Sequence, residues 1–264
     1  MSKFAAISKE AFSEKSWTRP TDFSFAAGFP TTPVVAAELP SLVPAMPLGF
    51  VRNGGTFELV AICSLQPSNN LYVAPDGRWL GGYIPALLRS YPFRLAKAQG
   101  RDDSILCIDE ASGMIVDHGQ GVPFFEASGE PAPALKDILN MLTQIERSGV
   151  ATQAAISALD SARLIQPWPL SLQPDSQPAA MAHGLFRIDE AAMNALSEEN
   201  FLKLRGNGAF AIAYAQLLSM HQLGLLQRLD QVQTELKAQA EAQMNVLSAL
   251  EGLFQDDGTI TFTY

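Results

Sequence analysis

The segment Asn70–Phe93 has the sequence NLYVAPDGRWLGGYIPALLRSYPF and combines turn, aromatic and basic residues more densely than any other part of the chain. Its Leu71–Val73 run has the composition of a short strand. The Pro-Asp-Gly sequence at 75–77 is typical of a turn in which the glycine adopts a positive φ. Apolar residues then recur at helical spacing, which predicts a helix that begins near Ile84 and is ended by Pro92. The segment therefore predicts a strand, a turn and a helix in succession.

The remainder of the first half predicts further strands joined by short turns. Val34–Leu39 fits either a short strand or one helical turn. Prolines and aromatic residues are frequent before it, so we expect residues 1–33 to form an arm that wraps the domain. Apolar, β-prone residues between turn signals mark the other strands, which are Phe57–Leu65, Phe93–Ala98, Ile105–Asp109 and Met114–Val116.

The second half changes to helical periodicity. Apolar stripes predict helices over residues 134–147, 152–164 and 209–250, a stop at Gly149 and a helix that Ser197 caps. The last helix either folds back at Gly224 or protrudes to pair with a partner helix. A proline-rich loop lies between Pro167 and Pro178, and alternation over Thr259–Tyr264 predicts a final strand.

These elements predict the α+β class, with a strand-rich N-terminal half of mixed or antiparallel sheet packed against a helical C-terminal half. No repeat or linker divides the 264 residues, so we expect one domain over residues 1–264. Within it, residues 1–33 are the arm, residues 34–226 the core, and residues 227–264 the end of the long helix and the last strand.

Charge and composition exclude some classes of partner and of location for the protein. The formal net charge is −9 and the pI about 4.8, which argues against nucleic acid and anionic membrane surfaces as partners. The apolar run Ala209–Leu218 is far shorter than the about 20 residues that a membrane span needs, so no span is predicted. No signal-peptide core follows Met1, and Cys63 and Cys107 lie in apolar runs that favour buried free thiols. Together these features favour the cytoplasm.

No recognised catalytic or cofactor-binding motif is present. The chain lacks a phosphate-binding glycine loop and a Gly-x-Ser-x-Gly elbow. Its three histidines are far apart in sequence, so neither a metal nor a cofactor is predicted. Asp117 and His118 form the best acid–base pair by residue type, although adjacent residues on a strand point to opposite faces.

The candidate ligand-binding residues are Trp79, Tyr83, Arg89 and Tyr91, with Asp109 and His118 as further candidates. Tyr83 and Arg89 have the groups to orient a carboxylate or a peptide carbonyl, and the aromatic rings supply apolar area. The structural alternative is that Trp79 is a core residue, Tyr83 packs on the sheet and Arg89 pairs with an acid such as Asp109.

The chain resembles the SapC family of bacterial proteins over about residues 34–226. The matching motifs are Asn70–Val73, Asp76–Trp79, Tyr83–Ala86, Arg89, Tyr91–Phe93, Gly184–Glu190, Leu202–Arg205 and Ala213–Met220. The resemblance implies an association with a bacterial surface layer. It also implies a setting near TonB-dependent receptors and flavin-dependent tryptophan halogenase-like proteins. Some relatives are labelled peptide-transporter permeases, a label with which the absence of a predicted span disagrees.

The leading functional hypothesis is a soluble binding or accessory protein that recognises a peptide or protein partner. It includes homo-oligomer formation through the C-terminal helix. The alternatives are an enzyme of unknown reaction acting on a peptide or amino acid, and a structural surface-layer protein. The enzyme hypothesis requires Tyr83, Arg89 and either Asp109 or His118 to converge in one concave pocket.

Overall fold

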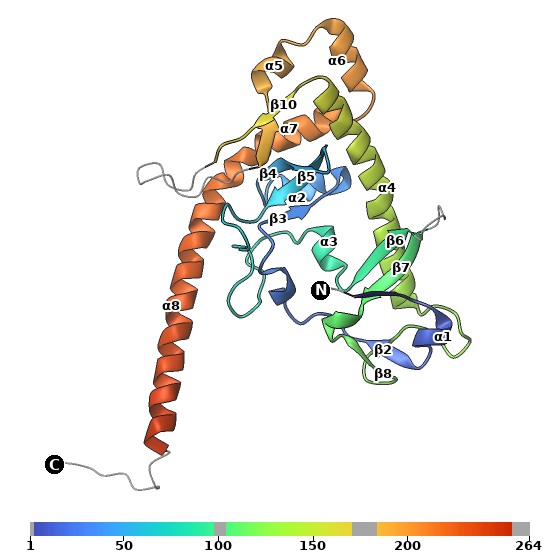
Figure 1. Ribbon diagram of the computed structural model, residues 1–264, viewed down its shortest axis with the longest axis vertical. Coiled ribbons are helices and arrows are strands. Elements are labelled where there is room, and N and C mark those ends of the chain that lie inside the picture. The colour runs from blue at the N-terminus through green and yellow to red at the C-terminus, as the bar shows by residue number, and fades with distance from the viewer. Residues whose placement is uncertain (1–2, 98–103, 171–183, 255–264) are drawn as a thin grey trace, which may run out of the picture.

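The computed structural model describes residues 3–97, 104–170 and 184–254, with side chains described as far as residue 247. It confirms the α+β class, because antiparallel strands dominate the first half and helices dominate the second (Figure 1). The division of the chain into arm, core and helix end stays a prediction.

The central element is a five-stranded antiparallel sheet with the order β10-β11-β4-β5-β3. Gly54 and Gly55, both at positive φ, close the hairpin between β4 and β5. Strands from both halves of the chain thus meet in one sheet. Their bounds are β3 (Thr31–Pro33), β4 (Leu48–Asn53), β5 (Thr56–Ile62), β10 (Ile165–Pro167) and β11 (Leu185–Ile188).

Two three-stranded antiparallel sheets lie beside it, with the orders β1-β7-β6 and β8-β2-β9. The first 33 residues contribute one strand to each of the three sheets, so this part of the chain is held by backbone pairing. The bounds are β1 (Phe4–Ala6), β2 (Lys15–Trp17), β6 (Phe93–Lys97), β7 (Ser104–Asp109), β8 (Ile115–Asp117) and β9 (Val122–Pro123).

Short helices connect these strands. The predicted turn of helix at Val34–Leu39 is present, and the predicted helix after Ile84 is α3. The bounds are α1 (Lys9–Phe12), η1 (Ser24–Ala26), η2 (Ala36–Glu38), α2 (Leu39–Leu42), α3 (Ala86–Arg89) and η3 (Glu110–Ser112).

The long helix α4 (Pro133–Ser161) spans the body and passes through Gly149, so the predicted stop at that glycine is wrong (Figure 1). Helix η2 docks on this turn of α4. The Ala37 N–H donates to the Ser148 hydroxyl at 3.1 Å, and the Ala36 N–H donates to Thr152 Oγ1 at 2.8 Å. These tertiary hydrogen bonds offset the loss of helix stability, about 1 kcal/mol, that a glycine causes inside a helix.

Helix α7 (Ala209–Ser219) packs on the central sheet through polar as well as apolar contacts. The Gln216 amide accepts from the Ile188 N–H at 2.9 Å and donates to the Leu48 carbonyl at 3.2 Å. Ser219 accepts from the Leu48 N–H at 2.9 Å. Before it lie α5 (Glu190–Asn194) and α6 (Glu198–Arg205), whose predicted N-cap Ser197 is confirmed, and after it η4 (Met220–Gln222).

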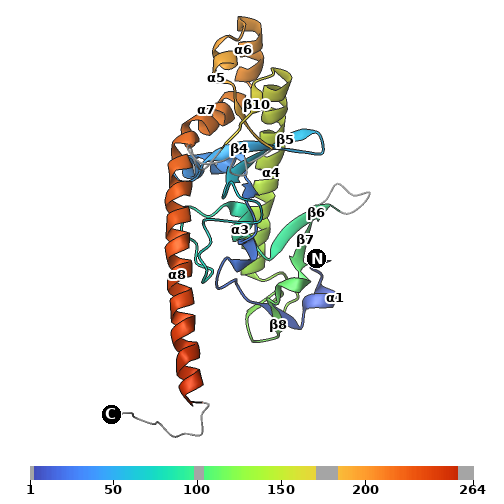
Figure 2. The same ribbon diagram turned by 60° about the vertical axis from the view of Figure 1, so that its left-hand side comes forward.

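The last helix, α8 (Leu223–Phe254), continues past Gly224 and protrudes. Figures 1 and 2 show its lower half standing clear of the other elements. Its upper half buries Leu226, Leu229 and Gln233 against the body.

One helical stretch, Ala209–Leu247, is long and apolar enough by length and composition to cross a membrane, with a mean hydropathy of 1.3 in its most apolar window. Core helices of globular proteins meet the same criterion, and 39% of that window is buried inside the protein. The absence of a membrane span therefore stays a prediction.

The structure corrects some predicted elements and leaves others untested. Leu71–Val73 is not a strand, because only the isolated bridge between Val73 and Trp79 forms there. Strands β10 and β11 were not predicted. Within the predicted proline-rich loop, residues 171–178 lie outside the described residues, as does the predicted Thr259–Tyr264 strand.

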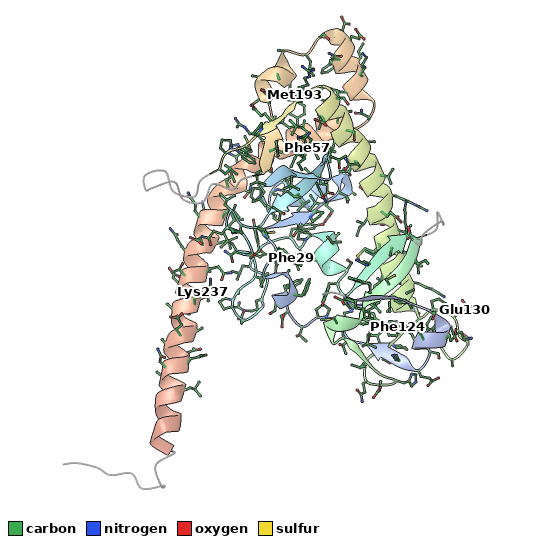
Figure 3. The ribbon with its side chains drawn as sticks, viewed as in Figure 1. Phe29, Phe57, Phe124, Glu130, Met193 and Lys237 are labelled. Atoms are coloured by element: carbon green, nitrogen blue, oxygen red, sulfur yellow. The ribbon has the colours of Figure 1, made fainter. Side chains whose placement is uncertain are left out.

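Of three apolar clusters among the described residues, the two largest join the sheets to the long helices. The larger one lies between the central sheet, α4 and α7 and includes Phe57 and Met193. The smaller one joins the two smaller sheets to the start of α4 and includes Phe124. Figure 3 places Phe57 and Met193 in the upper part of the molecule and Phe124 in the lower part.

Gly149→Ala is expected to raise the free energy of unfolding by about 0.5–1 kcal/mol, because alanine favours the helix and restricts the unfolded chain. The new Cβ would meet only Val35 Cγ1, at 3.8 Å. Urea denaturation checks this. Gly81→Ala is the contrasting variant, since its Cβ would lie 2.7 Å from Tyr72 Cδ1 and should lower the stability. A Gly149→Ala variant that unfolds at a lower urea concentration would contradict the prediction.

Cys63 is expected to be inert toward thiol reagents in the folded protein. Both cysteines are free and buried, as predicted, and burial raises the pKa of the Cys63 thiol to about 12. The thiolate, which is the reactive form, is therefore scarce at pH 8. In a Cys107→Ser variant, one thiol should react with dithiobis-nitrobenzoate in urea and none without it. Rapid labelling of the folded variant would overturn this assignment.

Candidate functional site

Before α3, the segment Asn70–Phe93 is irregular backbone, which is held in place by its own Asn70 and by a side chain from α8. Asn70 accepts from the Tyr72 N–H at 3.0 Å and donates to the Ala26 carbonyl at 3.1 Å. From α8, the Gln233 amide donates to the carbonyls of Leu71 at 3.1 Å and Val73 at 2.6 Å. These bonds satisfy buried polar groups that no sheet partner reaches.

The carboxylate of Glu38 binds two groups of the segment, and the residue is only 7% exposed. Its Oε1 accepts from the Ala86 N–H at 2.6 Å and from the Tyr83 hydroxyl at 3.1 Å. Its Oε2 accepts from the Val35 N–H at 3.2 Å. One side chain thus caps both η2 and α3, because each helix begins with N–H groups that lack an intrahelical partner. Burial and then the Glu38 charge raise the pKa of the Tyr83 hydroxyl.

Trp79 and Arg89 complete this cluster on either side of Tyr83. The Trp79 indole N–H donates to the Tyr83 carbonyl at 2.9 Å, and its ring stacks on Tyr72 with centroids 5.3 Å apart. Arg89 donates to the Tyr83 hydroxyl at 3.2 Å and to the Ile84 carbonyl at 3.1 Å. Its guanidinium also lies 5.5 Å from the centre of the Tyr83 ring. The cluster is a packed and largely satisfied structural unit.

Two cavities lie beside the segment and share Leu88, Tyr91 and Phe93 as a common wall. The first, here named the arginine cavity, has a volume of about 420 Å³ and includes Arg19 and Arg89. The second, here named the Phe29 cavity, has a volume of about 460 Å³ and includes Phe29 and Asp109. Both volumes lie in the range of small-ligand sites.

Both charged side chains of the Phe29 cavity, Asp109 and Arg94, already have partners. Asp109 is 4% exposed and accepts from the N–H groups of Lys3 and Ala111, at 3.2 and 3.1 Å. The Arg94 guanidinium lies 3.4 Å from the centre of the Phe4 ring. Burial, followed by the Asp109 charge, raises the pKa of the Tyr91 hydroxyl.

The six predicted site residues divide into three groups. Trp79 and Tyr83 belong to the cluster around Glu38, as the structural alternative expects for Trp79. Arg89, Tyr91 and Asp109 line the two cavities. His118 is exposed in the turn after β8 and lines neither cavity.

One predicted pairing is wrong. Arg89 bonds to Tyr83 and Ile84 rather than to Asp109, and the two residues line different cavities apart from the shared wall. Tyr83 and Arg89 do meet, but neither Asp109 nor His118 joins them. The convergence that the enzyme hypothesis requires is therefore not formed by these residues.

Sequence reasoning missed Glu38, Gln233 and Arg19. An acidic residue three positions after Val35 is a capping-box spacing and was an available signal for Glu38. Neither Gln233 nor Arg19 carries such a signal, since their roles come from contacts between distant parts of the chain. Within residues 3–97, 104–170 and 184–254, no group of three or more His, Cys, Asp or Glu side chains is placed to hold a metal ion.

The SapC family model matches residues 7–226, and the chain therefore belongs to the SapC family. The match begins at residue 7 rather than near residue 34 and so includes β2 and β3, which contain none of the family motifs named earlier. No curated protein and no solved structure matches the chain.

Glu38→Ala is expected to lower the free energy of unfolding by about 2–4 kcal/mol, because it leaves two N–H groups and the half-buried Tyr83 hydroxyl without their charged acceptor. Urea denaturation measures the loss. Glu130→Ala is the matched control, since Glu130 is exposed and points away from the body (Figure 3), and it should change stability by less than about 0.5 kcal/mol. Equal midpoints for the two variants would show that Glu38 does not hold the segment.

Proposed function

We propose that this SapC-family chain is a binding or accessory protein that recognises a protein partner through the lower half of α8. The observation that supports the proposal is an apolar stripe that continues along α8 beyond the point where the body ends. The cytoplasm is the proposed location, since two free cysteines suit a reducing compartment. An accessory role in a TonB-dependent uptake or halogenase-like modification system is the setting that the family resemblance implies.

The stripe follows a single face of the helix. In the upper half that face carries Leu226, Leu229 and Gln233, all buried against the body. From Gln233 the stripe continues through Leu236 into the lower half of the helix in steps of three and four residues. Residues with this spacing lie on one face, because an α-helix has 3.6 residues per turn. The lower members of the stripe are Ala240, Met244 and Leu247.

Nothing in the described part of the chain covers the lower stripe. From Lys237 to Leu247 every residue is exposed, with Met244 at 71% and Leu247 at 59%. In Figure 3, Lys237 marks the level at which α8 separates from the body. Helices of this length are marginal in water without tertiary packing, so a partner that covers the stripe would stabilise the helix as well as bind it.

The stripe is best matched by an amphipathic helix of another protein. Pairing along one face at steps of three and four residues is the geometry of helix–helix recognition. In this part of α8, Glu235 and Glu241 outnumber Lys237, and the whole chain has a net charge of −9. Basic residues flanking the apolar face of the partner would complement this charge, whereas a second copy would bring like charge.

The partner test uses the full chain and a polar double variant, Met244→Gln with Leu247→Gln. Tagged proteins are incubated with native lysate, and captured proteins are quantified by mass spectrometry. A true partner should be captured at least about tenfold less by the variant, because most of an interface's binding energy resides in a few buried apolar anchors. Ala238→Gln with Asn245→Gln changes the opposite face and should leave capture unchanged.

Hydrogen exchange then locates the contact. Adding the purified partner should slow exchange of the amides in residues 237–247 of the full chain. A partner that binds both double variants equally, without protecting these amides, would place the contact elsewhere and overturn the proposal. Light scattering that shows a dimer lost in the Met244/Leu247 variant would identify a second copy as the occupant instead.

A further inference from the structure

We propose that the arginine cavity binds a free carboxylate carried on an apolar side chain. Its charged groups come from segments far apart in sequence, since Arg19 precedes η1, Arg89 ends α3 and Asp137 lies in the first turns of α4. The site is independent of α8, which contributes no residue to it.

The floor of the cavity suits an apolar group. Trp17, Leu88 and Phe93 line it and are each no more than 3% exposed. Trp17 and Phe93 meet edge to face, with ring centroids 4.8 Å apart and an interplanar angle of 85°. Ile138 and Met141 of α4 extend this apolar surface toward the rim. Burying an aliphatic or aromatic side chain here removes apolar area from water, which favours binding.

The rim suits a carboxylate. Within the part of the chain that the structure describes, no acidic side chain pairs with Arg19 or Arg89. Arg89 uses one N–H on Tyr83 and one on Ile84, which leaves three of its five donors for a ligand. Two guanidinium groups at one cavity are an arrangement that recognises a carboxylate through charge-assisted hydrogen bonds.

The neighbouring Phe29 cavity lacks these features. Its Arg94 rests on the Phe4 ring, and its Asp109 already accepts from two backbone N–H groups. The shared wall of Leu88, Tyr91 and Phe93 separates two cavities, of which the first has two arginines and the second has one arginine and the buried Asp109. The carboxylate is therefore assigned to the arginine cavity.

A free carboxylate next to an apolar side chain occurs in two kinds of ligand, the C-terminus of a peptide and a free amino acid. Asp137 distinguishes them, because it is exposed at the rim of the same cavity. A free amino acid brings an ammonium group that can pair with Asp137. A peptide C-terminus has an amide nitrogen at that position, which carries no charge.

Calorimetric titration of the full chain tests the site with three probes, N-acetyl-L-phenylalanine, its uncharged amide and L-phenylalanine. At least one of the two acids should bind, and N-acetyl-L-phenylalaninamide should bind at least about tenfold more weakly than the better acid, since it lacks the charge. Arg19→Gln should weaken the better acid by about tenfold. The exposed Arg19 side chain makes no hydrogen bond or ion pair within the described residues, so the variant should fold.

Arg94→Gln is the matched control, because Arg94 is an exposed arginine of the Phe29 cavity, and it should leave the affinity unchanged. Preferential binding of L-phenylalanine that Asp137→Asn removes would identify a free amino acid as the ligand. Preferential binding of the acetylated acid, unaffected by Asp137→Asn, would identify a peptide C-terminus. Equal affinity for acid and amide, no binding of either acid, or loss of binding in Arg94→Gln but not Arg19→Gln would overturn the proposal.

Discussion

The buried carboxylate of Glu38 is the interaction on which the surrounding architecture depends. A carboxylate this deep in a protein is costly unless its oxygens are hydrogen-bonded, and here three donors from two segments of the chain supply those bonds. It joins η2, which docks on α4, to α3, which forms a wall of both cavities. The positions of α4, α3 and Arg89 are consequently linked through one side chain.

Local patterning predicted the elements whose residues are set by their neighbours in sequence. The strands β5, β6 and β7 and the helix capped by Ser197 lie close to where periodicity and turn residues placed them. The failures occur where tertiary contacts override local preference. Gly149 has the propensity of a helix end, yet η2 stabilises the turn around it, and Leu71–Val73 has the composition of a strand, yet its carbonyls bond to a glutamine of α8.

The candidate site was predicted in residue type more than in arrangement. The density of aromatic and basic residues in Asn70–Phe93 located a segment that does line two cavities. Whether an arginine here forms an ion pair, however, depends on the relative placement of Arg19, Arg89 and Asp109. These residues are brought together by β-sheet pairing and helix packing, for which no local sequence signal exists.

Gln233 sets a limit on how short a stable version of this chain can be. The SapC family match ends at residue 226, but the two carbonyls that Gln233 satisfies belong to buried residues in the first third of that match. A fragment cut at the family boundary would leave both acceptors without their donor and would uncover part of the apolar cluster that Leu229 closes. The smallest independently folding unit thus extends beyond the family boundary, into the helix that also carries the exposed stripe.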